Sequence, residues 1–406
     1  MGKNYHIAEV KDKADEKAFL RLPVKIYRKD PHWIRPLDED VKAVFDPSRN
    51  KLFRQGEAVR WLLRDGRGEV VGRVAAFINW PAARKYEYPV GGMGFFECIP
   101  DREAAFMLFD ACRRWLEERG VKAMDGPINF GERDRFWGLL VEGFTEPGYG
   151  VNYNPPYYRD FFESYGFREY FGQLIYHRKI ERGALRPAML ERARRLLSNP
   201  DYSFGYLPRH RMKELPEMVR TIFNKAWASF PGVPRMSEAQ ARHLYHSLRP
   251  ILDEKLLWFG YYRDEPISFF LMIPEINQVL KHLNGKLHWF NKLRFFWYKD
   301  VLHVIDKAVG ILFGVVPEHR RKGVEAAMIH EFSKVAYSEQ FRYRELEMNW
   351  IADYNPPMMK VLDQIGATVT KRLITYRYIF DPSIPFERAA LVNVRRRKEK
   401  HDGKQA

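Results

Sequence analysis

The stretch Val315-Val316-Pro317-Glu318-His319-Arg320-Arg321-Lys322-Gly323-Val324-Glu325-Ala326-Ala327-Met328-Ile329 decides the fold that the sequence predicts. The apolar run 311–316 indicates a strand that ends at Pro317, and a helix is expected after Gly323. A strand that leads through a basic turn into a helix brings backbone N–H groups and the positive end of the helix dipole to one point. The stretch therefore predicts an anion-binding turn, although an ordinary strand–turn–helix joint with a solvated basic rim has the same pattern.

Further along the chain, apolar and polar side chains alternate over residues 344–351. Such alternation predicts a strand with one polar face. Glu345, Glu347 and Asn349 would project together from that face.

The motif Asp353-Tyr354-Asn355-Pro356-Pro357 comes next and leads into a helix, a glycine stop and a last strand over 372–380. This order of elements resembles the Gcn5-related N-acetyltransferase (GNAT) superfamily. In that family, the turn after the fourth strand binds the pyrophosphate of acyl-CoA, and an asparagine after the fifth strand lies beside the pantetheine arm. Arg320, Gly323 and Asn355 stand at these family positions.

The resemblance implies that acyl-CoA is a co-substrate of this chain. Its expected binding residues are Val315, Val316, Arg320, Arg321, Lys322, Gly323, Val324 and Asn355. Two positions depart from the family pattern. Glu325 stands where the family turn usually has a small residue, and Leu362 replaces a helix tyrosine that often acts as general acid.

Composition and charge narrow the class of protein. A chain of 406 residues with 46% hydrophobic content is long enough for two domains with sizeable cores. Cys98 and Cys112 are too few for a disulfide framework or a cysteine-based zinc site. The first residues lack the apolar core of a signal peptide, and no apolar run reaches the ~18 residues of a membrane span, so we expect a cytoplasmic protein. The net charge of +16 favours an anionic partner.

An internal repeat indicates two copies of one structural plan. Tyr153-Asn154-Pro155-Pro156 recurs as Tyr354-Asn355-Pro356-Pro357, and residues 61–79 match residues 258–277. Several elements in the same order argue for a tandem protein. The predicted fold is α/β (α+β), with two GNAT-like domains that are each a mixed, mostly antiparallel sheet flanked by helices. The expected parts are a first domain over 1–182, a linking helix within 183–200, a second domain over 201–386 and a basic tail over 387–406.

The two copies differ at the turn that would bind the cofactor. The first copy has the net acidic sequence Asp101-Arg102-Glu103-Ala104 with no glycine, which would repel a diphosphate. We therefore expect the second half to bind acyl-CoA and the first half to shape the acceptor site.

N-acyl transfer needs a neutral amine, a group that takes its proton and a proton source for the leaving thiolate. Glu347 is the first candidate for the base, although an ordinary ion-pair role fits it equally well. The further catalytic candidates are Tyr376, as an acid in place of the missing helix tyrosine, and Glu132. A core tyrosine explains Tyr376 more simply, and an ordinary solvated loop explains the polar residues 129–134 equally well. The candidates for the acceptor site are Asn129, Asp134 and Asn349. The histidines have no metal-ligand spacing, and we expect no metal.

Residues 281–299 interleave aromatic and basic side chains. Such a segment can lie at an anionic lipid surface or stack on single-stranded nucleic acid. A helix or hairpin that packs on its own domain, with its basic residues outward, is the third interpretation.

Three segments, 27–33, 126–134 and 283–286, resemble the corresponding segments of a bacterial group of long tandem GNAT-like proteins associated with ceramide synthesis. The resemblance implies acyl transfer to a lipophilic amine such as a sphingoid base, with possible peripheral contact at the inner membrane face. Two other hypotheses stay open: an aminoacyl-tRNA-dependent transferase of the tandem GNAT type, and a non-catalytic GNAT-like protein that binds RNA or a membrane.

Overall fold

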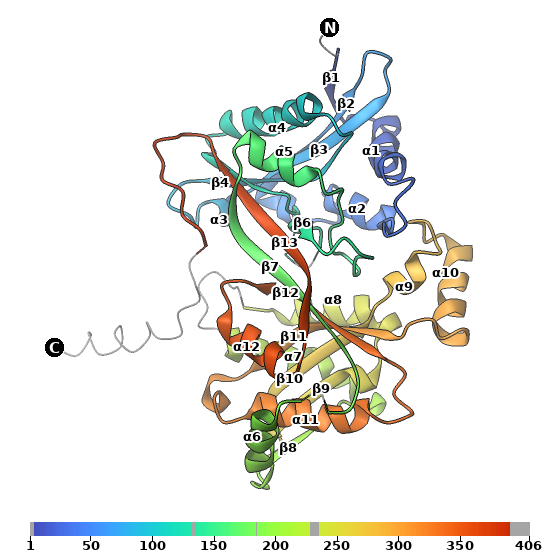
Figure 1. The fold of residues 1–406 in the computed structure, drawn as a ribbon, viewed down its shortest axis with the longest axis vertical. Helices are drawn as coiled ribbons and strands as arrows, with labels where there is room; N and C mark the ends of the chain where they lie inside the picture. Colours follow the sequence, from blue (N-terminus) through green and yellow to red (C-terminus); the bar gives the residue numbers. More distant parts are fainter. Residues whose placement is uncertain (1–3, 132, 134, 184, 228–234, 390–406) are drawn as a thin grey trace, which may run out of the picture.

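The computed structural model describes residues 4–389 except 132, 134, 184 and 228–234. Thirteen strands form one mixed, mostly antiparallel sheet that helices flank (Figure 1). The predicted fold class is therefore confirmed. The elements up to the end of β7 are β1 (His6–Glu9), α1 (Lys13–Ile26), α2 (Asp38–Val44), β2 (Gly56–Arg64), β3 (Val70–Asn79), α3 (Trp80–Ala83), β4 (Val90–Cys98), α4 (Arg102–Glu117), β5 (Ala123–Gly126), β6 (Leu139–Glu142), α5 (Tyr158–Tyr165) and β7 (Arg168–Lys179).

The remaining elements belong to the second part of the chain. They are α6 (Pro187–Leu197), β8 (Tyr202–Tyr206), α7 (Leu215–Trp227), α8 (Glu238–Leu248), β9 (Leu257–Tyr262), β10 (Glu265–Pro274), α9 (Asn277–Leu280), α10 (Trp289–Phe296), β11 (Lys307–Val315), α11 (Val324–Ala336), β12 (Glu345–Ala352), α12 (Pro356–Gln364) and β13 (Thr368–Ile379).

The structure repeats the plan that the sequence repeats. In the first half, β2, β3 and β4 pair antiparallel, and β5 pairs parallel to β4 after the crossover helix α4. In the second half, β9, β10 and β11 pair antiparallel, and β12 pairs parallel to β11 after α11. A parallel pair needs such a crossover because a short turn cannot return the chain to the same end of the sheet.

The last strand of each half completes the sheet of the other half. The strand order is β1-β2-β3-β4-β5-β13-β7-β12-β11-β10-β9-β8, with β6 paired to β13 outside this path. Strand β7 therefore pairs with β12, β13 pairs with β5, and the two exchanged strands pair antiparallel with each other in the middle of the molecule (Figure 1). The boundaries predicted at residues 182 and 201 stay a prediction about the sequence halves, because the sheet runs across them.

The hydrophobic cores explain why the exchange is stable. Ile374 and Tyr376 of β13 are fully buried in the core of the first half, among residues of α4 and α5. Tyr176 of β7 is buried in the core of the second half. Each half thus buries apolar surface contributed by the other half, which favours the joined sheet.

Local sequence signals account for the ends of two helices. The carboxylate of Asp101 accepts from the N–H of Ala104 at 3.1 Å and caps α4. Gly166 ends α5 with a φ of 111°, a conformation that favours glycine. The linking helix expected within 183–200 is α6, whose buried Met189 and Ala193 pack in the core of the second half. Of the predicted basic tail, residues 390–406 lie outside the described residues.

The exchanged strand β13 is tied to β5 by a buried ion pair. Arg377 donates from Nε and Nη2 to the two oxygens of Asp125 at 2.6 and 2.8 Å. We expect Arg377→Ala to destabilise the protein by about 3–5 kcal/mol, because Asp125 would stay buried without its partner. Urea unfolding measures this loss. Arg263→Ala breaks the exposed pair with Asp201 and should cost within about 1 kcal/mol, and equal losses for the two variants would contradict the role of the buried pair.

Candidate functional site

The neighbouring strands β11 and β12 separate after a short paired stretch. Within the described residues, they pair only between 307–310 and 345–348, although β11 continues to Val315 and β12 to Ala352. Beyond this point the pairing of β12 with β7 is also irregular, and Trp350 has a φ of 56°. A non-glycine residue in this left-handed region indicates local strain. The strands therefore diverge at Met348, in the middle of the sheet of the second half.

Three polar atoms at this divergence have no hydrogen-bond partner among the described residues. They are Glu347 Oε1, Asn349 Oδ1 and Trp350 Nε1, and all three are buried. Buried polar atoms in native proteins nearly always have a partner, so a cluster of unpartnered atoms indicates a place where a ligand or water binds. The polar face that the sequence predicts for this strand is thus the face of a candidate site.

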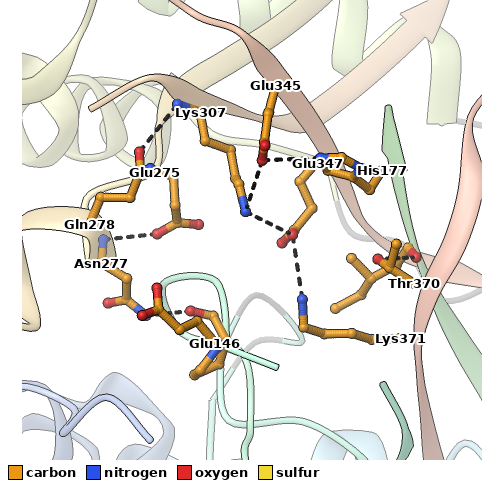
Figure 2. Close-up of polar contacts among 12 residues, drawn as sticks. Glu146, His177, Glu275, Asn277, Gln278, Lys307, Glu345, Glu347, Thr370 and Lys371 are labelled. Carbon is orange, nitrogen blue, oxygen red and sulfur yellow. Dashed lines mark hydrogen bonds and ion pairs between the residues drawn. The ribbon is translucent and has the colours of Figure 1, made fainter. Parts of the chain in front are cut away.

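Glu347 lies between two lysines, Lys307 of the adjacent strand β11 and Lys371 of β13, which is two strands away (Figure 2). Its Oε2 is 3.6 Å from Lys371 Nζ and 3.9 Å from Lys307 Nζ. Glu347 is 2% exposed and Lys371 is 4% exposed, so these charges are almost completely removed from water. At the rim of the cluster, Glu345 accepts from His177 at 3.1 Å and lies 3.5 Å from Lys307.

A second buried carboxylate, that of Glu275, lies beside Glu347. It follows strand β10 and accepts from the backbone N–H groups of Tyr149 and Asn277, at 3.0 and 2.9 Å. Burial and repulsion by the nearby Glu347 raise the pKa of Glu275 to about 7. The two carboxylates therefore form a pair in which one member can change its protonation state at neutral pH.

Gly148 fits between these side chains because it has no side chain of its own. A Cβ on Gly148 would lie 2.9 Å from Glu275 Oε2, 2.9 Å from Glu347 Oε1 and 3.4 Å from Asn349 Nδ2. The loop that carries Gly148 belongs to the first half. The nearby Asn277 donates to Pro147 O in this loop at 2.9 Å. The first half therefore closes one side of the carboxylate pair.

The basic turn over residues 317–323, which the sequence predicts to bind an anion, has a backbone that suits this role. Gly323 has a φ of 96° and is the N-cap of α11, and no side chain in the described part of the chain caps the helix. The first N–H groups of α11 have no acceptor within the helix, as at any helix start. Lys322 and Arg321 beside them are exposed. Val315, Val316 and Val324 frame the turn, and Val316 and Val324 are buried in the core.

Arg320 stabilises the turn itself. Its Nε donates to Val315 O at 3.0 Å, and its Nη2 donates to Ala226 O. The guanidinium group thus holds the end of β11 against α7. A direct contact between Arg320 and a phosphate stays a prediction.

An apolar groove lies between α11 and α12, on the opposite face of the diverging strands. Leu362, Met358 and Val361 line it from α12, together with Phe332 of α11 and Met348 of β12. Leu362, which stands at the family's tyrosine position, is 2% exposed within this apolar surface. Asn355 caps α12 through a 3.4 Å contact from Met358 N.

Of the remaining predicted site residues, the structure describes Tyr376 and Asn129. Tyr376 is fully buried, and its hydroxyl donates to Glu163 at 2.9 Å inside the first half. Asn129 is buried in the first half, and its Oδ1 has no hydrogen-bond partner among the described residues. Glu132 and Asp134 lie outside the described residues. Arg133, which lies between them in the sequence, donates to the Tyr354 hydroxyl of the second half at 2.9 Å.

Sequence reasoning missed Glu275, Lys371 and Gly148. Each belongs to a different segment, and their proximity depends on the joined sheet. The repeat could have drawn attention to Glu275, since it precedes Asn277 at the end of a repeated segment.

A separate cavity lies in the first half, next to the carboxylate pair. Its lining includes Tyr149 and Asn277, the two residues whose backbone N–H groups bond Glu275, and the apolar Phe95, Phe136 and Leu280. The cavity thus reaches from the interface of the two halves toward the core of the first half.

Across the residues that the structure describes, no group of three His, Cys, Asp or Glu side chains could hold a metal ion. In the same residues, no helix has both the length and the apolar character that crossing a membrane requires.

The raised pKa of Glu275 predicts a dependence of stability on pH. Between about pH 4.3, where an unfolded glutamate ionises, and pH 7, the folded state holds a proton that the unfolded state has lost. Stability should therefore fall as the pH rises through this range. Glu275→Gln stays neutral and should be more stable than the parent at pH 8, by up to about 3 kcal/mol, and similar to it at pH 4.

Urea unfolding of the two proteins at both pH values measures this difference. Glu265→Gln, at the exposed start of the same strand β10, is the matched control. A Glu275→Gln variant whose stability differs from the parent equally at both pH values would contradict the raised pKa.

Comparison with known proteins supports the fold. No family model matches the chain. The protein YghO of Escherichia coli (strain K12) is 27% identical over 376 residues, which cover 90% of this chain and 93% of that protein. The bacterial ceramide synthase of Caulobacter vibrioides (strain NA1000 / CB15N) is also 27% identical over 376 residues, which cover 91% of this chain and 96% of that protein.

Two solved structures have a similar fold. A tandem GNAT protein from the clavulanic acid biosynthesis pathway matches with a TM-score of 0.50 and 12% identity, over 94% of this chain and 100% of that chain. The fungal multi-domain GH3 β-N-acetylglucosaminidase that contains a GCN5-related glucosamine N-acetyltransferase region matches with a TM-score of 0.53 and 14% identity, over 93% of this chain and 38% of that chain. The chain therefore has the fold of a tandem GNAT protein.

Proposed function

We propose that the protein is an acyl-CoA-dependent N-acyltransferase of the GNAT type, with a lipophilic amine such as a sphingoid base as acceptor. The observation that carries this proposal is the buried pair Glu275 and Glu347 at the divergence of β11 and β12. The similarity to the bacterial ceramide synthase supports the choice of acceptor.

The donor would bind along the opening between the two strands. The diphosphate of acyl-CoA can accept from the first N–H groups of α11, and Lys322 and Arg321 add positive charge. The negative charge of Glu325, in the first turn of this helix, would repel the diphosphate. The attraction by the backbone N–H groups and the two basic side chains must therefore exceed this repulsion. The amides of a pantetheine arm can bond the backbone of β11 where β12 has left it.

The carboxylate pair would take the proton of the amine. In the reaction, the amine nitrogen bonds the thioester carbon, the carbon–sulfur bond breaks, and a proton leaves the nitrogen. Glu347 Oε1, which has no hydrogen-bond partner among the described residues, would accept that proton, and Glu275 beside it titrates near neutral pH. Thiols ionise near pH 8.5, so the CoA thiolate can leave without a nearby tyrosine acid.

The cavity of the first half is our candidate for the acceptor chain. It adjoins Glu275 through Tyr149 and Asn277, and aromatic and aliphatic side chains form much of its lining. An amine at the carboxylate pair could therefore place an apolar chain in this cavity, which would suit a lipophilic acceptor.

The test is release of free thiol from palmitoyl-CoA by the purified full chain, with and without sphinganine. We expect thiol release that depends on the amine, together with an amide product detected by mass spectrometry. Acetyl-CoA and bulk aminoacyl-tRNA serve as alternative donors. If no acyl-CoA releases thiol with any amine, and aminoacyl-tRNA is consumed instead, the acyl-CoA proposal is wrong.

Replacing Glu347 tests the proposed base. Glu347→Gln should lower kcat by about 10²–10⁴-fold, because the neutral amide cannot take the proton. Loss of this charge also leaves Lys371 buried beside a neutral group, so the melting temperature is measured alongside. Glu347→Gln/Lys371→Met removes both charges. Recovery of stability without recovery of rate supports the catalytic role, whereas recovery of both would show that Glu347 is only structural.

Replacing Lys322 tests the donor site. Lys322→Gln should raise the KM for palmitoyl-CoA by about three- to tenfold with little change in kcat, because one positive charge near the diphosphate is lost. Lys334→Gln, near the other end of α11, is the matched control and should leave KM unchanged. An equal rise in KM for both variants would argue against a diphosphate at this turn.

A further inference from the structure

The helix α10 and the residues after it expose an unusual amount of apolar surface. Eleven large hydrophobic residues are exposed among the described residues, and seven of them lie within 289–302. Trp289 is 74% exposed, Leu293 is 61% exposed and Trp297 is 56% exposed. Exposed hydrophobic residues are normally scattered, so this concentration indicates a binding surface. We name residues 289–302 the α10 surface.

The outward direction of these side chains is fixed by the fold. Trp289, Leu293 and Trp297 are spaced four residues apart and therefore follow one face of the helix. On the opposite face, Phe295 and Asn291 are buried. Asn291 Nδ2 donates to Lys286 O at 2.9 Å and so fastens the helix to the preceding turn. The apolar face is thus held toward the surroundings rather than exposed by a loose segment.

Basic residues outnumber acidic ones in the segment that carries this apolar face. Residues 286–302 contain four basic residues and one acidic residue. Lys286 and Lys292 are exposed, while Lys299 pairs with Asp300 at 2.6 Å. A partner that covers the α10 surface must therefore offer both apolar and negatively charged groups.

We propose that the α10 surface docks on an anionic lipid bilayer. Tryptophan side chains favour the boundary between lipid headgroups and acyl chains, and basic residues attract anionic headgroups. The eight residues of α10 span about 12 Å, so the helix would lie in the interface rather than cross the membrane. This proposal does not depend on acyl transfer.

Other occupants fit the α10 surface less well. Single-stranded RNA could stack on the exposed aromatic residues of this surface, but Leu293, Val301 and Leu302 offer no stacking face, whereas acyl chains contact aliphatic and aromatic side chains alike. A second copy of the chain would bring two positively charged surfaces together. The segment Arg395-Arg396-Arg397-Lys398 near the end of the chain is itself basic and does not complement the charge.

The α10 surface lies close to elements at the interface of the two halves. Helix α10 stands at the edge of the molecule beside α9 (Figure 1). Leu280 of α9 lines the cavity of the first half. Gly285, between α9 and α10, accepts from Asp38 N at 2.9 Å in the first half. A bilayer on the α10 surface would therefore lie near elements that form this cavity.

Co-sedimentation of the full chain with vesicles tests the proposal. We expect binding to vesicles of phosphatidylcholine with 30% phosphatidylglycerol, weaker binding at high salt, and little binding to phosphatidylcholine alone. Leu293→Glu and Trp297→Glu should each lower the bound fraction at least fivefold. Leu244→Glu, on the exposed part of α8, is the matched control and should bind like the parent.

Each variant is first checked for an unchanged melting temperature. The proposal is overturned if the parent binds neither kind of vesicle, or if Leu293→Glu and Leu244→Glu bind alike. It is also overturned if the α10 variants instead lose binding to single-stranded RNA or lose a dimer that the parent forms.

Discussion

The pairing of β7 with β13 in the middle of the sheet is the constraint on which the rest of the structure depends. Each strand ends one half of the sequence and completes the sheet of the other half. Without β13, β5 would be paired only with β4, and without β7, β12 would be paired only with β11, so one edge of each strand would be open. Unpaired strand edges and exposed apolar cores are both unfavourable in water, so the two halves stabilise each other.

The same pairing assembles the candidate site. Glu347 comes from β12, Lys371 from β13, Lys307 from β11 and Glu275 from the end of β10, while Gly148 comes from a loop of the first half. Burial of two carboxylates together disfavours ionisation of both, which accounts for the raised pKa of Glu275. The fold thus supplies a proton-accepting group at neutral pH where two strands separate.

The sequence predicted the repeated elements well because strand alternation, helix caps and turn residues are local signals. It also predicted the backbone of the basic turn at Gly323 and the polar face that carries Glu347. It could not predict the exchange of β7 and β13, since periodicity shows that a segment is a strand without showing its partner. Glu275 was missed for the same reason: its neighbours are distant in sequence. Tyr376 has the chemistry of an acid, but β13 carries it into the core of the first half.

The most direct test of the account is the pH dependence of kcat/KM for acyl transfer by the parent and by Glu275→Gln. If the carboxylate pair takes the proton of the amine, the parent should show an inflection near pH 7, the pKa of Glu275, and the variant should lose that inflection. An inflection near pH 7 that persists unchanged in Glu275→Gln would contradict the account and place the essential titrating group elsewhere.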